Sequence, residues 1–185
     1  MVAKARVVSV PAESPKVPVA LFYNPDWLSD DDLLNGFTAR LPLLDFLRDE
    51  LCRSPLRGTV QHMLLVGVRG SGKTTLLKRL AVAIRRETGL ADHLVALSFP
   101  EELYQVKGLA DLWWAACEAL EDALHEAGEH LAAAALTVRI EAERFERPID
   151  DVHDEHALRL LLQTCSSIGR RPVLLIDNLD LVLDR

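Results

Sequence analysis

One octapeptide constrains the fold of this chain more than any other feature. Residues 67–74 read GVRGSGKT, and the apolar run Met63–Val66 precedes them. Apolar residues follow at the spacing of one helix face: Leu76, Leu77, Leu80, Ala81 and Ile84. The pattern therefore predicts a strand over Val60–Val66, a glycine-rich turn, and a helix over Gly72–Glu87.

The residue types in this turn are those that bind a polyphosphate. Glycines let backbone N–H groups converge on one anion at the positive end of the following helix. Lys73 is expected to reach the β and γ phosphates, and the Thr74 hydroxyl to bind the Mg2+ that bridges them. We therefore expect ATP and Mg2+ at this loop. The stretch assigned to the nucleotide is Gly67, Val68, Arg69, Gly70, Ser71, Gly72, Lys73, Thr74 and Thr75, with Thr75 expected to be a spectator.

A second element delivers a carboxylate to the end of a buried strand. Val173–Ile176 is wholly apolar, and Asp177 follows it directly. In parallel α/β sheets, ligands lie beyond the carboxyl ends of the strands, so Asp177 and Lys73 are expected to converge on one site. Asp177 would then hold Mg2+, either directly or through water.

Composition and charge exclude several classes of protein. The chain has 185 residues, is 49% hydrophobic and carries a formal charge of -7, so its bulk charge does not indicate a strong grip on nucleic acid. Its three cysteines, Cys52, Cys117 and Cys165, lack metal-binding spacing and predict reduced, buried thiols. No apolar stretch approaches the roughly 20 residues that cross a bilayer. We expect a cytoplasmic protein without a membrane segment.

The chain divides into three predicted regions. Residues 1–20 are expected to form a flexible arm, residues 21–58 a helical segment, and residues 59–185 the core. In the helical segment, Ser29 should begin a helix that stops near Asn35-Gly36, and Thr38 should cap a helix over Leu41–Cys52. In the core, the elements predicted after the first strand and helix are strand His93–Phe99, helices Leu109–Ala127, Ala132–Arg147 and Val152–Ile168, the last capped by Asp150 or Asp151, and strand Pro172–Ile176.

With both elements in place, the chain resembles the P-loop NTPases of the AAA+/STAND (ORC-like) ATPase type. The phosphate loop corresponds to the Walker A motif, and Val173–Asp177 corresponds to the Walker B motif. The resemblance implies a three-layer α/β/α fold with a parallel sheet and, here, a helical insertion between the second strand and the Walker B strand. It also implies that the segment Gly36–Arg40, with its Phe37 and Arg40, lies near the adenine.

The sequence departs from this family at two places. Typical AAA+ members have a Glu after the Walker B Asp, but here Asn178 follows, and an amide is a poor proton acceptor. Either Asn178 positions the attacking water or Asp180 acts as the base. The sequence also ends at Arg185, before the further strands, sensor residues and arginine finger that the resemblance implies. We therefore expect an incomplete sheet, and an N-terminal piece of a longer ATPase that a protein partner or self-association completes.

Three functions remain open from the sequence. The first is an ATP-binding module that hydrolyses Mg-ATP to drive conformational change, with Lys73, Asp177, Asn178 and Asp180 as its catalytic residues. The second is a small metabolite kinase, in which the strands that carry Lys73 and Asp177 are direct neighbours. The third is a nucleotide sensor or assembly protein that holds ATP without turnover, which Asn178 motivates.

Overall fold

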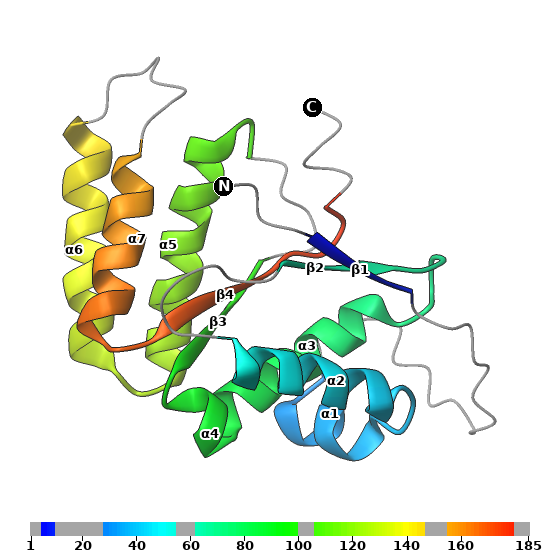
Figure 1. Cartoon of the computed structure of the whole chain (residues 1–185). Coiled ribbons are helices and arrows are strands. Elements are labelled where there is room, and N and C mark those ends of the chain that lie inside the picture. Colours follow the sequence, from blue (N-terminus) through cyan, green and yellow to red (C-terminus); the bar gives the residue numbers. More distant parts are fainter. Residues whose placement is uncertain (1–4, 10–27, 55–61, 100–105, 147–154, 180–185) are drawn as a thin grey trace. The chain divides into compact units, whose positions relative to one another are not determined.

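The computed structural model describes residues 5–9, 28–54, 62–99, 106–146 and 155–179 (Figure 1). The chain forms two compact units, Met1–Leu90 and Ala91–Arg185, and each contains one two-stranded parallel sheet. The α/β class, the parallel strands and the helical insertion before the Asp177 strand are confirmed. The boundaries predicted at residues 20 and 58 stay predictions.

The first unit is built around one helix. In its sheet, β1 (Ala5–Ser9) pairs in parallel with β2 (His62–Val66), with Val7 opposite Leu64. The helices are α1 (Asp30–Gly36), α2 (Leu41–Arg53) and α3 (Lys73–Arg86), and the short α4 (Thr88–Ala91) lies at the unit boundary. Both α1 and α2 pack against α3. The buried side chains of these three helices include Leu33, Leu44, Leu47, Leu51, Leu76, Leu80 and Ile84.

The prediction of a flexible arm over residues 1–20 is wrong for β1. Val7 and Val8 are β-branched, a residue type that favours strands, and the parallel ladder with β2 pairs backbone groups on one edge of Ala5–Ser9. The three prolines that suggested an arm, Pro11, Pro15 and Pro18, lie outside the described residues. The error came from giving their composition to the whole segment.

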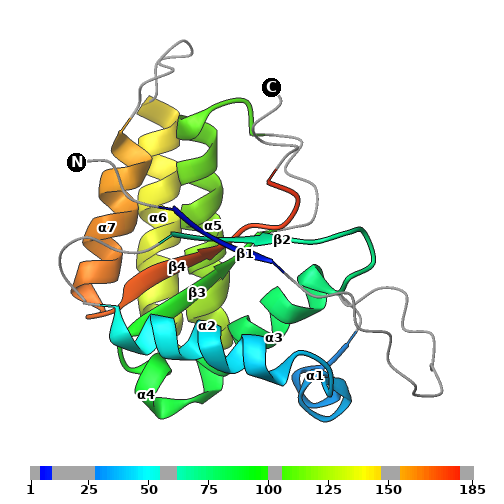
Figure 2. The same ribbon diagram turned by 45° about the vertical axis from the view of Figure 1, so that its right-hand side comes forward.

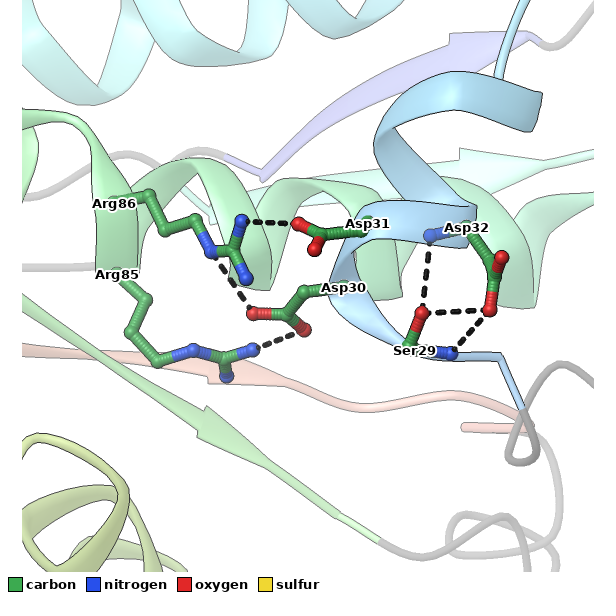
Figure 3. A network of polar contacts seen from close by, with 6 residues as sticks. All are labelled: Ser29, Asp30, Asp31, Asp32, Arg85 and Arg86. Carbon is green, nitrogen blue, oxygen red and sulfur yellow. Dashed lines mark hydrogen bonds and ion pairs between the residues drawn. The ribbon is translucent and has the colours of Figure 1, made fainter.

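Polar contacts fix the start of α1, as Figure 3 shows. Ser29 caps the helix as predicted: its hydroxyl accepts from the Asp32 N–H at 3.1 Å, and the Asp32 carboxylate accepts from the Ser29 N–H at 3.2 Å. Asp30 accepts from Arg85 at 2.7 Å and pairs with Arg86 at 3.2 Å. These partly exposed pairs connect the start of α1 to the last turn of α3.

The start of α2 differs from the prediction. Arg40, rather than Thr38, is the N-cap residue, and it forms no side-chain cap hydrogen bond. Its backbone is left-handed, with φ of 62°, a conformation that is unfavourable for a residue with a side chain. Pro42 in the first turn has no N–H to satisfy, which reduces the need for a side-chain cap.

The second unit places three helices beside its sheet (Figure 2). Strands β3 (Leu94–Ser98) and β4 (Arg171–Leu175) are parallel, with Ala96 opposite Val173. Between them in sequence come α5 (Leu109–Glu126), α6 (His130–Glu146) and α7 (His156–Ser167). Helix α5 packs against α6, α7 and β3. The core includes Leu97, Trp114, Ala116, Leu120, Leu124, Leu136, Ile140, Leu160 and Leu161.

The helix boundaries of this unit largely match the predictions. Gly128, with φ of 75°, separates α5 from α6, as its place in the helical pattern indicated. Helix α7 begins at His156 with Glu155 as its N-cap. The predicted caps Asp150 and Asp151 lie outside the described residues.

The cysteines confirm the expectation of buried thiols in two of three cases. Cys117 and Cys165 are buried, and burial raises the pKa of each thiol to about 12, which makes them poor nucleophiles at neutral pH. Cys52 is exposed, contrary to the prediction, because it lies on α2 beside the inward-facing Leu51. Among the described helices, none is long and apolar enough to cross a membrane.

Candidate functional site

The loop between β2 and α3 has the backbone geometry that its glycines predict. Gly70 and Gly72 both have φ of 75°, in the left-handed region that glycine alone adopts readily. Between them, the Ser71 N–H donates to the Val68 carbonyl at 3.1 Å and closes a turn. Gly72 is the N-cap of α3, and its carbonyl accepts the first helical hydrogen bond from Leu76 at 3.0 Å.

This geometry presents backbone donors at the end of a helix dipole. The N–H groups of Lys73, Thr74 and Thr75 belong to the first turn of α3, where helix geometry provides no acceptor within the helix. The first turn contains no acidic side chain. An anion at this end of the 14-residue helix would meet backbone N–H groups and the positive end of the dipole.

Lys73 lies over the loop that it follows. Its Nζ donates to the carbonyl oxygens of Gly67 at 2.9 Å and Val68 at 3.4 Å. Both acceptors are neutral carbonyls, so the positive charge of Lys73 remains available to an anion at the same place. The side chain is half-buried, which strengthens its attraction for a phosphate.

Two hydroxyl residues flank this lysine. Ser71 is only 7% exposed, and its Oγ is buried without a hydrogen-bond partner. Thr74 is half-buried on the first turn of α3. A buried hydroxyl without a partner and a glycine-lined turn fit a polyphosphate, because phosphate oxygens would supply the missing acceptors.

Arg40 contacts this loop, although it lies 27 or more residues before the octapeptide in the chain. A Cβ built on Gly72 would lie 2.5 Å from Nη1 of Arg40, so the guanidinium occupies the space that any side chain at position 72 would need. The family resemblance implied that this arginine lies near the adenine. The contact that the structure has is with the backbone of the phosphate loop, and sequence patterns gave no signal for it.

Asp177 and Asn178 are described within the second unit. Strand β4 ends at Leu175, two residues before Asp177, and the half-buried Asp177 accepts the Asn178 N–H at 2.9 Å. Asn178 has φ of 50°, so the strand does not continue through it. The alternation that would place residues 178 and 180 on one side of a continuing strand therefore does not apply, and Asp180 lies outside the described residues.

The predicted site residues are thus placed in two groups. The first comprises Gly67–Thr75 together with Arg40, all in the first unit. The second comprises Asp177 and Asn178 in the second unit. The convergence of Asp177 with Lys73 stays a prediction. Phe37 is the C-cap residue of α1, and its predicted place beside an adenine also stays a prediction.

Comparison with known proteins identifies one relationship. The family model described as AAA ATPase domain matches residues 36–184, which is most of the chain. The match begins at Gly36, in the segment that contains Arg40, and includes both the phosphate loop and Asp177. No curated protein and no solved structure matches the chain.

The loop geometry predicts that Gly72→Ala weakens the binding of Mg-ATP by about tenfold or more. The new methyl group would displace Arg40, and its left-handed backbone would cost about 1 kcal/mol. Isothermal titration calorimetry measures the change. Gly128→Ala is the matched control, because Gly128 has the same φ of 75°, has no atom within 4 Å of a built Cβ and lies outside the phosphate loop, so this variant should bind as the native chain does. If Gly72→Ala bound Mg-ATP as tightly as the native chain does, the role given to Gly72 in the site would be wrong.

Proposed function

The chain belongs to the AAA ATPase domain family, and we propose that it is an ATP-binding module of the AAA+ and STAND type that holds Mg-ATP at Gly67–Thr74. The observation that carries the proposal is the approach of Lys73 to the carbonyl oxygens of Gly67 and Val68 at the N-terminus of α3. The Lys73 ammonium, the first-turn N–H groups of α3 and the positive end of its dipole therefore lie close together, an arrangement that favours binding of a negatively charged triphosphate.

Each residue of the site has a separate task in this proposal. Lys73 neutralises the β and γ phosphates, and the first-turn N–H groups of α3 donate to their oxygens. The Thr74 hydroxyl and the Asp177 carboxylate are oxygen ligands of the kind that Mg2+ prefers. When bound, Mg2+ would neutralise charge on the phosphate chain.

Conformational change is the proposed output. A bound nucleotide favours the conformation to which it binds most tightly, so ATP binding can shift the population of the chain's conformations. Exposed apolar side chains on α6 support a protein partner or a second copy as the recipient of that change: Leu131 is 90% exposed and Val138 is 65% exposed.

A second candidate function is nucleotide binding without turnover. The residue after Asp177 is Asn178, whose amide cannot accept a proton from an attacking water at neutral pH. Its left-handed backbone, with φ of 50°, also turns the chain away from the strand direction at this point. The protein would then respond to the presence of ATP and not to its hydrolysis.

ATP binding is tested by Lys73→Ala. Loss of the ammonium should weaken Mg-ATP binding by at least about tenfold, since a hydrogen bond between charged groups contributes roughly 1.5–3 kcal/mol. Calorimetry of the native and variant chains measures this. Lys107→Ala, which removes an exposed lysine from the second unit, serves as the control and should bind as the native chain does. Normal binding by Lys73→Ala would show that the site is assigned wrongly.

The two candidate functions differ in turnover. If the module hydrolyses ATP, phosphate release should be measurable with the native chain, and Asp177→Ala should lower it by on the order of a hundredfold while ATP binding in the absence of Mg2+ stays the same. If the protein only holds ATP, the native chain releases no phosphate above background. Turnover that persists in Asp177→Ala would contradict the metal-binding role of this carboxylate.

A further inference from the structure

Arg40, like Arg79 of α3, has a buried guanidinium nitrogen without a hydrogen-bond partner. Arg48 pairs with Glu87, Arg53 with Asp49 and Glu50, and Arg85 and Arg86 with the acids of α1. Unlike these ion-paired arginines, Arg40 has an Nε that is buried and has no partner. A buried N–H donor without an acceptor is unfavourable, and the charge of the guanidinium favours an anion as a partner.

The backbone of Arg40 is also unfavourable. Its φ of 62° lies in the left-handed region, which disfavours every residue with a Cβ. Glycine or asparagine would be the usual choice at such a position. Strained backbone of this kind persists where the surrounding structure holds a side chain for a function.

The direction of the side chain supplies the third observation. From the N-cap of α2, the guanidinium reaches the phosphate loop, with Nη1 2.5 Å and Cζ 3.6 Å from the position of a Cβ on Gly72. It therefore lies at the N-cap residue of α3, next to the first turn of that helix. Planar, multiply donating guanidinium groups bind phosphate in two-pronged geometry.

From these three observations we propose that Arg40 is a second cation of the phosphate site, whose guanidinium binds oxygens of the nucleotide phosphate chain beside Gly72. The inference rests on the proposed binding of ATP at this loop and specifies which part of the nucleotide Arg40 recognises. It assigns this arginine to the phosphates and not to the adenine. Because Arg40 begins α2, phosphate binding would also hold the first turn of that helix against the loop.

The test compares Arg40→Gly with the native chain in calorimetric titrations of Mg-ATP, tripolyphosphate and adenosine. Glycine removes the guanidinium and accepts the left-handed backbone, so the melting temperature should equal or exceed that of the native chain. We expect affinity for Mg-ATP and tripolyphosphate to fall by about ten- to a hundredfold, and affinity for adenosine to change by less than about twofold. Arg40→Lys, which retains the charge, should recover part of the loss.

Arg53→Ala is the control, because it removes another arginine of α2 at the opposite end of the helix and should bind all three ligands as the native chain does. Unchanged affinity of Arg40→Gly for tripolyphosphate would overturn the inference, as would an equal loss for adenosine, which would indicate contact with the nucleoside. If the native chain bound neither Mg-ATP nor tripolyphosphate, the proposed function itself would fail. These outcomes separate the two claims.

Discussion

The left-handed conformation of Gly70 and Gly72 is the constraint from which the site follows. Two residues with φ of 75°, separated by Ser71, turn the chain from the end of β2 into the start of α3 within a few residues. Any other residue type would resist this backbone. The turn leaves the first N–H groups of α3 without helical acceptors and places Lys73 over the carbonyls of Gly67 and Val68. It also leaves space at Gly72 that Arg40 fills.

The same helix connects the site to the core of its unit. Leu76, Leu80 and Ile84 of α3 are buried, and α1 and α2 pack against it. The ion pairs of Arg85 and Arg86 hold α1 near the far end of α3, while Arg40 reaches the near end from α2. An anion bound at the N-terminus of α3 would therefore act on a helix against which both α1 and α2 pack. This is how local binding of a phosphate chain could be transmitted beyond the loop.

Local sequence patterns predicted most of the helices and strands. They carried no information on contacts between residues that are distant in the sequence. The spacing of Leu76, Leu80 and Ile84 predicted α3. Ser29 and the aspartates that follow it predicted the start of α1. Strand β1 was missed because its few β-branched residues lie close to prolines, and only pairing with β2 makes it a strand. The Arg40 contact depends on how α2 packs on α3, which no periodicity encodes. Asn178 was noticed for its chemistry, but its left-handed backbone was not anticipated.

The central claim is that the phosphate chain of ATP binds at the loop and at the first turn of α3. Amide hydrogen exchange of the native chain, measured with and without saturating Mg-ATP, tests it directly, since exchange reports local opening of backbone N–H groups. The account predicts that ATP slows exchange most strongly in peptides covering residues 67–75. Unchanged exchange in these peptides, with protection confined to other segments, would contradict the account.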